Sequence, residues 1–266
     1  LILKIDASEA LSLPGVNGFV THKDVPKNNH WGIMLKDEEF FASNEVLFVG
    51  QLIGVIVANT KQLAKKAANL VHIEYKELDV CLNIQDALEK NSFYDGFNKT
   101  IEKGTFRQDD TEDLLVFEGE CNVGGQEHFY LETHGCLIVP RGEDSELDVY
   151  SSTQHPTETQ TEIAHALGVP LNRICCRVKR LGGGFGGKET RATFLAVVIA
   201  VAANKLGIPV RCILDRDIDM LTTGTRHPFY GKYKIYCTKD GIFKSYSLDL
   251  IANAGHSYDL SRAVME

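Results

Sequence analysis

The sequence predicts a mixed α/β protein, α+β in part, made of two consecutive domains. Three observations support this prediction. Segments with the alternating pattern of strands are interspersed with segments that have helical periodicity. A polar, aperiodic stretch between residues 92 and 113 separates two such regions. A glycine cluster at residues 182–187 lies between a strand pattern and a helix pattern, an arrangement typical of α/β proteins.

The first domain is predicted from alternating strand and helix signals. Residues 46–57 are rich in Val, Ile, Leu and Phe and contain two glycines, which predicts two strands or one bent strand. Residues 60–70 have apolar side chains at helical spacing, and Thr60 is a suitable N-cap. Residues 71–75 alternate as a half-buried strand does, and residues 85–89 predict one short helix.

A linker is predicted at residues 93–112, because this stretch is polar, shows little periodicity and is interrupted by glycines. The expected domain boundaries are therefore 1–92 and 113–266.

The second domain is predicted to contain two helices and several strands. The first helix spans 156–167, because proline suits the first helical position and Gly168 suits the end. A longer helix is expected at about 188–205, before Gly207. Strands are expected in the remaining apolar segments, which are 114–123, 135–139, 147–150, 174–178, 210–214 and a hairpin formed by 230–237 and 242–251.

Composition excludes several classes of function. The chain has 28 basic and 36 acidic residues and a formal charge of −8, which argues against binding to nucleic acid. It has no run of 18 apolar residues, so no transmembrane helix is expected. Seven cysteines without a C-x-x-C pair favour neither a zinc ribbon nor an iron–sulfur cluster, and indicate reduced thiols in a cytoplasmic protein. Because the sequence starts without methionine, it is expected to be an internal piece of a longer protein.

The glycine cluster has the layout of an anion-binding loop, in which backbone N–H groups and a helix N-terminus face an oxygen ligand. A Walker A loop is one interpretation, but Glu189 occupies the position that needs a hydroxyl group. A dinucleotide fingerprint is a second, but Asp215, the nearest suitable acid, follows Gly187 by 28 residues. A close-packed turn without a ligand is a third, although so many glycines cost considerable chain entropy.

Four separated segments resemble the molybdenum hydroxylases of the xanthine dehydrogenase and aldehyde oxidase family. These are residues 124–133, 152–154, 181–191 and 226–229. The resemblance extends over essentially the whole chain, and several motifs in the same order are more specific than one glycine loop. It implies a small α/β hammerhead domain in residues 1–92, followed by the first part of a molybdopterin-binding domain in residues 113–266.

The resemblance also implies which residues lie around the cofactor. In this family the loop equivalent to Phe185 and Gly186 brings backbone N–H groups close to the molybdenum. The glutamine equivalent to Gln154 lies on another face of the metal centre, where an amide donates without adding charge. The metal is held by a pterin, so no cluster of Cys or His ligands is expected. The residues expected to contact the cofactor are Gln154, Gly183, Gly184, Phe185 and Gly186.

Glu189 is the residue that the resemblance implies for substrate binding. The matching glutamate of xanthine dehydrogenases forms hydrogen bonds with the purine ring, and aldehyde oxidases generally lack an acid there. The alternative is a carboxylate that only complements the helix dipole. Glu127, His128 and Glu132 are expected to serve the structure around the cofactor and not to bind a metal.

The implied activity is hydroxylation of hypoxanthine and xanthine to uric acid, with electrons passing through two [2Fe–2S] clusters and FAD to NAD. The iron–sulfur and FAD domains would precede Leu1, and the glutamate base would follow Glu266. No catalytic residue is therefore expected within this sequence, and the sequence alone is expected to be inactive. The parent protein is expected to be a homodimer in the cytoplasm or the peroxisome. The alternatives are an aldehyde oxidase and a non-catalytic relative with the same fold.

Overall fold

The computed structural model describes residues 1–96, 98–106, 113–142 and 144–266. The chain forms two compact units. The α/β unit comprises residues 1–78 and 127–225, and the β unit comprises residues 79–126 and 226–266. These units are interleaved along the chain, whereas the sequence predicts consecutive domains. Compact units and family domains are different divisions of a chain, so the boundaries at 92 and 113 stay predictions.

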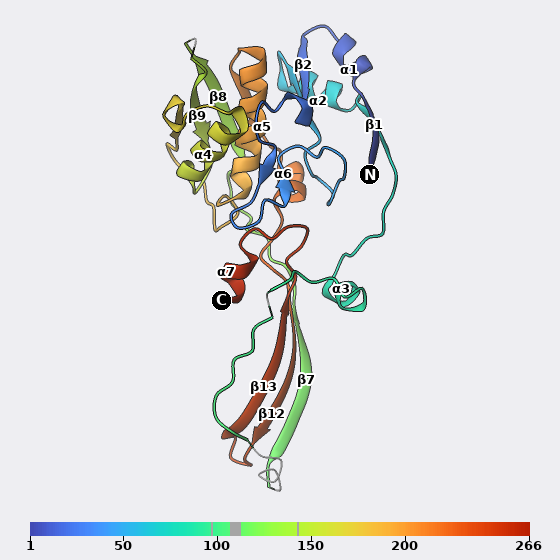
Figure 1. Ribbon diagram of the computed structural model, residues 1–266, viewed down its shortest axis with the longest axis vertical. Helices are drawn as coiled ribbons and strands as arrows, with labels where there is room; N and C mark the ends of the chain where they lie inside the picture. Colours follow the sequence, from blue (N-terminus) through green and yellow to red (C-terminus); the bar gives the residue numbers. More distant parts are fainter. Residues whose placement is uncertain (97, 107–112, 143) are drawn as a thin grey trace. The chain divides into compact units, whose positions relative to one another are not determined.

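A four-stranded sheet with two helices on one face forms the larger half of the α/β unit (Figure 1). The strand order is β10-β9-β8-β11, in which β9 and β10 are parallel and the other neighbours antiparallel. The strands are β8 (Gly135–Arg141), β9 (Glu146–Ser151), β10 (Ile174–Arg177) and β11 (Val210–Ile213), and the helices are α4 (Pro156–Leu167) and α5 (Arg191–Leu206). A third helix, α6 (Arg216–Thr223), follows β11. The bounds of α4 are those that the sequence predicts.

Helix α5 is the centre of the core. Its side chains are apolar on nearly all sides, as expected for a helix that is buried all round. One side packs on the sheet and on α4, and two strands from the first part of the chain, β2 (Val16–Thr21) and β5 (Gly54–Ala58), also contact it. Strands β8, β10 and β11 alternate more buried and more exposed residues, so that one set of side chains faces the helices. Fully buried aliphatic residues of this core include Ile138, Val149, Ile163, Ile174, Val197 and Ile199.

The N-terminal segment, residues 1–78, contains two antiparallel strand pairs. Strand β1 (Ile2–Asp6) pairs with β6 (His72–Tyr75), and β2 (Val16–Thr21) pairs with β5 (Gly54–Ala58). The other elements are α1 (Ser8–Ser12), α2 (Lys61–Ala68) and the short pair β3 (His30–Trp31) and β4 (Glu38–Glu39). The predicted cap of α2 is confirmed, because Thr60 Oγ1 accepts a hydrogen bond from the Leu63 N–H over 3.2 Å.

The predicted strand at 46–57 is wrong over most of its length, because only Gly54–Ala58 is a strand. Residues 46–53 are irregular. Gly50 has a φ of +100°, and its backbone packs directly against Leu221, which prevents a side chain there. The apolar side chains of Phe48 and Leu52 line a cavity instead of facing one side of a sheet.

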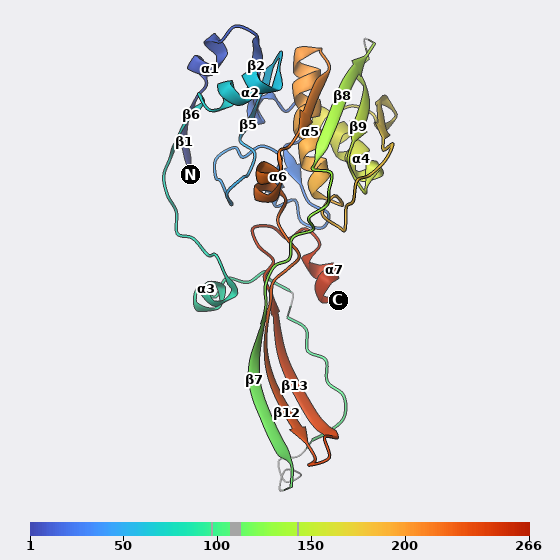
Figure 2. The ribbon, with the colours of Figure 1, turned by 180° about the vertical axis from the view of Figure 1, so that it is seen from behind.

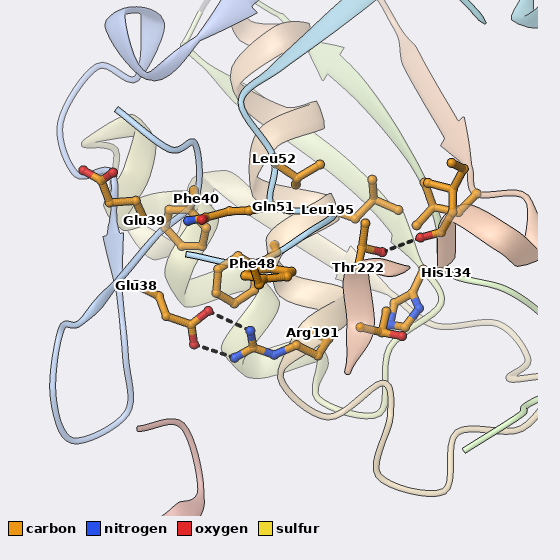
Figure 3. Close-up of a pocket in the computed structure, with 15 residues that line it drawn as sticks. Glu38, Glu39, Phe40, Phe48, Gln51, Leu52, His134, Arg191, Leu195 and Thr222 are labelled. Atoms are coloured by element: carbon orange, nitrogen blue, oxygen red, sulfur yellow. Dashed lines mark hydrogen bonds and ion pairs between the residues drawn. The ribbon is translucent and has the colours of Figure 1, made fainter. Parts of the chain in front are cut away.

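A buried ion pair joins the N-terminal segment to the start of α5. Arg191 Nη1 and Nη2 donate to the two carboxylate oxygens of Glu38 over 2.7 Å each (Figure 3). The side chains are 12% and 4% exposed. The guanidinium also lies against the rings of Trp31 and Phe194.

We expect Arg191→Met to lower the local free energy of unfolding around α5 by about 3–5 kcal/mol, because Glu38 would keep a buried charge without its partner. Hydrogen exchange of the α5 amides in the full-length protein measures this loss. The double variant with Glu38→Gln should recover part of it, since it removes the unpaired charge. Equal protection in Arg191→Met and the wild type would contradict the prediction.

The β unit is built on a long antiparallel sheet of three strands in the order β13-β12-β7 (Figure 2). The strands are β7 (Leu115–Val123), β12 (Phe229–Cys237) and β13 (Phe243–Ala252), and the unit also contains α3 (Ile84–Glu89) and α7 (Ser261–Met265). The predicted hairpin is confirmed as β12 and β13.

The two faces of this sheet differ in polarity. The register places Phe117, Ile235 and Tyr246 side by side, within a row of largely apolar residues that are partly exposed. The opposite face carries cross-strand ion pairs, Lys234–Glu118 and Lys232–Glu120. The sheet therefore presents one apolar and one charged face.

Residues 97 and 107–112 of the predicted linker lie outside the described residues. The rest of the linker contains neither helix nor strand. These linker residues belong to the β unit, and two of their aromatic rings contact its C-terminal part: Tyr94 lies 5.5 Å from Tyr258 and Phe106 lies 4.8 Å from Tyr236, measured between ring centroids. No helix among the described residues is long and apolar enough to cross a membrane.

Candidate functional site

The glycine loop, residues 181–190, joins the strand layer to α5 and is folded by two tight turns. The Gly187 N–H donates to Gly184 O over 2.8 Å, and the Glu189 N–H donates to Gly186 O over 3.1 Å. Gly183 and Gly186 have φ values of +90° and +88°, which glycine adopts without strain. Phe185 has a φ of +54° and is 74% exposed. An exposed aromatic residue in the left-handed region is unusual and often marks a functional position.

Other glycines of the loop are needed for close packing. A Cβ on Gly184 would lie 2.5 Å from Gln154 Cδ and Oε1. A Cβ on Gly187 would lie 2.7 Å from His128 Cγ and Tyr130 Cε1. Close packing thus accounts for Gly184 and Gly187. The sequence interpretation of a close-packed turn without a ligand explains this part of the glycine cluster. It does not account for Gly186, where a Cβ would meet nothing within 4 Å.

Gln154 is bound to the loop by its side chain and its backbone. Its Oε1 accepts from the Gly186 N–H over 3.0 Å and from the Lys188 N–H over 3.2 Å. Its own N–H donates to Lys188 O over 2.9 Å. Because Oε1 takes both N–H groups, the orientation of the amide is fixed, and Nε2 has no partner among the residues that the structure describes.

These bonds refine what the resemblance implies for the loop. The Gly186 N–H is already used by Gln154, whereas the Phe185 N–H has no acceptor within the described parts of the chain. The donors available to a ligand among the described residues therefore include the Phe185 N–H and Gln154 Nε2.

Glu132, Ser152 and Lys188 hold the base of the loop. Glu132 Oε2 accepts from the Gly182 N–H over 2.7 Å, from Ser152 Oγ over 2.8 Å and from Lys188 Nζ over 3.2 Å. Burial alone would raise the pKa of Glu132, but these three donors together hold it below its usual value. Burial lowers the pKa of Lys188, and the Glu132 carboxylate opposes that shift.

The lowered pKa of Glu132 predicts that acid weakens the attachment of the loop. A carboxyl group with a lowered folded pKa stabilises the fold fully above its unfolded pKa, and this contribution is lost as the pH falls through the folded pKa. We therefore expect wild-type protein to melt at a higher temperature than Glu132→Gln between about pH 6.5 and pH 5, and this difference to shrink as the pH falls from about 4.3, the usual pKa of a glutamate, toward about pH 3. Thermal unfolding of both proteins across this range is the measurement. A difference that does not vary with pH would contradict the assignment.

A second buried network lies beside the loop. Tyr130 Oη and the His134 N–H donate to the two carboxylate oxygens of Asp219, over 2.5 Å each. Burial and the bond to Asp219 raise the pKa of Tyr130, and burial lowers the pKa of His128. Among the described residues, no group of three or more His, Cys, Asp or Glu side chains is arranged to hold a metal ion.

Glu189 lies outside α5, which corrects the predicted helix start at 188. The helix begins at Arg191 with Thr190 as N-cap, because the turns of the loop continue through Glu189. Glu189 therefore stands one residue before the cap, and its side chain is exposed. The carboxylate still lies next to the positive end of the helix, so both interpretations of Glu189 from the sequence stay open.

The enclosed pocket shown in Figure 3 is not the site for a bound ring. It lies between residues 38–52 and helices α5 and α6, and none of Gln154, Phe185 and Glu189 lines it. Its volume is about 60 Å³. A cavity of about 150 Å³ is known to bind benzene, so this smaller one has room for a few water molecules and not for a purine ring.

Three of the four matching sequence segments meet in space. Residues 130 and 132, 152–154 and 181–191 contact one another in the α/β unit through the bonds above. The fourth segment, 226–229, belongs to the β unit, where the Arg226 N–H donates to Gln126 O over 3.0 Å and His227 Nε2 lies 2.9 Å from Ser261 Oγ. Lys188 is the residue whose role the sequence does not predict. The sequence singled out Lys188 only as the lysine of a possible Walker A loop, and that interpretation fails because Glu189 follows it.

Two family models match the chain. Residues 84–266 match the molybdopterin cofactor-binding domain, and residues 1–79 match the a/b hammerhead domain of aldehyde oxidase and xanthine dehydrogenase. The chain belongs to the aldehyde oxidase and xanthine dehydrogenase family. The resemblance of its motifs to this family is thus confirmed, as is the mixed α/β fold with a hammerhead domain followed by a molybdopterin-binding domain.

The family relatives include close sequence matches and solved structures. The chain is 52% identical to the xanthine dehydrogenase/oxidase of Gallus gallus and 49% identical to the xanthine dehydrogenase of Emericella nidulans, over 100% of this chain. It covers 19% and 20% of those proteins, so it spans about one fifth of their length. The aldehyde oxidoreductase of Desulfovibrio gigas superposes with a TM-score of 0.81 at 25% identity, covering 94% of this chain and 29% of that chain.

The loop and Gln154 fit a molybdenum–pterin group. The Phe185 N–H and Gln154 Nε2 are neutral donors, which suit oxygen atoms that carry negative charge. The edge of the loop at Gly186 is open, so a ligand can approach the backbone there.

Proposed function

We propose that the full-length protein containing this sequence is a molybdenum-dependent purine hydroxylase that oxidises hypoxanthine and xanthine to uric acid. The position of Glu189 carries this proposal. It is an exposed carboxylate beside the loop, outside the helix, at the end of the segment that presents the free donors. The identities of 52% and 49% to xanthine dehydrogenases support it.

In this proposal the residues around the loop have separate roles. Gln154 Nε2 and the Phe185 N–H orient the molybdenum–pterin group by hydrogen bonds. Glu189 binds the purine ring, either by accepting from ring N–H groups or, when protonated, by donating to a ring oxygen or nitrogen. Gly183, Gly184 and Gly186 give the loop its shape. The bound group supplies the redox chemistry, and this chain orients it and the substrate.

The remaining parts of the proposal concern the full-length protein. Electrons would leave through two [2Fe–2S] clusters and FAD to NAD, the glutamate base would come from another segment, and the protein would be a cytoplasmic homodimer. The 266 residues alone would therefore be inactive.

The test is the substrate preference of the purified full-length protein, with uric acid formed from xanthine compared with carboxylic acid formed from an aromatic aldehyde. We expect xanthine to have the higher kcat/KM, and protein produced with tungstate in place of molybdate to be inactive toward both. A higher kcat/KM for the aldehyde would favour the second candidate, an aldehyde oxidase. That candidate is supported by the structural likeness to the aldehyde oxidoreductase of Desulfovibrio gigas, at a TM-score of 0.81.

A further inference from the structure

We propose that Lys188 is the positioning residue of this site: its buried side chain, held by Glu132 and Ser152, fixes the loop so that the Gln154 amide keeps one orientation. The inference deepens the proposed function, and rests on it for the identity of the group that Gln154 faces.

The burial of Lys188 is the first observation. Its side chain is 0% exposed, whereas lysine is almost never fully buried without a partner. An ammonium group in such a place needs an acceptor for each of its three N–H donors. Nζ lies 2.8 Å from Ser152 Oγ and 3.2 Å from Glu132 Oε2, and it stands 4.6 Å from the centroid of the Tyr130 ring. The buried ammonium group therefore has two oxygen acceptors and a ring face next to it.

The backbone of the same residue holds Gln154. The Lys188 N–H donates to Gln154 Oε1, and Lys188 O accepts from the Gln154 N–H over 2.9 Å and from Thr153 Oγ1 over 3.3 Å. Lys188 is thus bound at its side chain and at both of its peptide groups to residues 152–154. A shift of its side chain would move its peptide and release one of the two donors that orient the Gln154 amide.

Glu132 extends this arrangement to the start of the loop. Its carboxylate accepts from the Gly182 N–H, and its own N–H donates to Gly182 O over 3.0 Å. Lys188 and Glu132 therefore hold both ends of the loop that carries Phe185 and Gly186. The loop cannot move relative to Gln154 without breaking a bond to a buried charge.

The pair is better suited to positioning than to stability. Removing one partner of an ion pair is strongly destabilising when the remaining charge stays buried. Glu132 is 44% exposed, so its carboxylate can be hydrated when Lys188 is removed. Lys188→Met should therefore leave the fold intact and free the loop.

The test uses the full-length, cofactor-loaded protein with Lys188→Met, and with Lys205→Met as the matched control. Lys205 lies near the other end of α5, where Nζ is 2.7 Å from Asp24 Oδ1 at the surface. Three quantities are measured: the molybdenum content, the electron paramagnetic resonance spectrum of the partly reduced metal after addition of dithionite, and kcat and KM for xanthine. Rates are expressed per bound molybdenum.

We expect Lys188→Met to change the spectrum and to lower kcat at least about tenfold, with KM within about twofold of the wild type, because the loop orients the metal group and not the purine. Lys205→Met should match the wild type in all three quantities. If Lys188→Met does not accumulate as folded protein, Ser152→Ala decides the question. It removes one acceptor of Nζ and should change the spectrum in the same direction.

An unchanged spectrum with unchanged kcat per molybdenum would overturn the proposal, as would the same changes in Lys205→Met. The proposed function can fail separately. A wild-type protein that does not oxidise xanthine refutes the purine assignment, while the spectra with dithionite still decide the role of Lys188.

Discussion

Replacing Gly184 by alanine is expected to lower kcat/KM for xanthine in the full-length protein about 100-fold or more. The new Cβ would lie 2.5 Å from Gln154 Cδ and Oε1, so the amide must move by about 1 Å. A displacement of that size at a reacting centre costs about 100-fold in rate. The measurement is the steady-state rate with xanthine, together with the molybdenum content of the same sample.

Gly18→Ala is the matched control for this substitution. Gly18 lies in β2, and a Cβ there would meet only Leu206 side-chain atoms, the nearest at 3.2 Å, which can shift. We expect this variant to retain wild-type kcat/KM. Gly184→Ala with a rate within about twofold of the wild type would mean that the position of Gln154 does not matter for the reaction.

Glu189→Ala is expected to lower kcat/KM for xanthine about 100-fold and to change that for an aromatic aldehyde less than about threefold. A hydrogen bond to a charged group contributes about 1.5–3 kcal/mol, and a site built to bind polar ring atoms loses most of its preference when the partner is removed. An aldehyde without ring nitrogens does not use this contact. Kinetics with both substrates on the same enzyme preparation give the comparison.

Glu189→Gln separates charge from hydrogen bonding at this position. The amide keeps an acceptor and a donor, so its xanthine rate should fall between those of the wild type and Glu189→Ala. Equal losses with xanthine and the aldehyde would assign Glu189 to the shape of the loop. The purine assignment would then fail.

Elements with strong local signals could be predicted from the sequence. Helix α4 has the predicted bounds because proline starts it and Gly168, with a φ of +71°, ends it. The hairpin of β12 and β13 follows from two alternating runs around a short turn. In both cases the residues that set the boundaries are neighbours in the chain.

Elements whose boundaries depend on distant contacts could not be predicted. Residues 46–53 have a strand-like composition, but the close approach of Leu221 to Gly50 excludes a strand there. Helix α5 starts at Arg191 and not at 188, because Lys188 is bound to Thr153 and Gln154. Helix α6 was not predicted from the sequence, and its Asp219 accepts hydrogen bonds from Tyr130 and His134 far back in the chain.

The sequence indicated the residues of the site but not the hydrogen bonds between them. Gln154, the glycine loop and Glu189 came from family motifs, and the structure brings Gln154 and the loop into contact. The motifs could not indicate that Gln154 takes the Gly186 N–H and leaves the Phe185 N–H free. Nor could they indicate that Lys188 is buried against Glu132, since the two are 56 residues apart.

The most direct test of the account is to locate molybdenum by anomalous scattering in a crystal of the full-length protein with a bound purine. We predict a metal peak beside the loop, with Gln154 Nε2 and the Phe185 N–H directed at atoms bound to it, and the Glu189 carboxylate within hydrogen-bonding distance of the purine ring. A metal peak elsewhere in the molecule, away from Gln154 and Phe185, would contradict it.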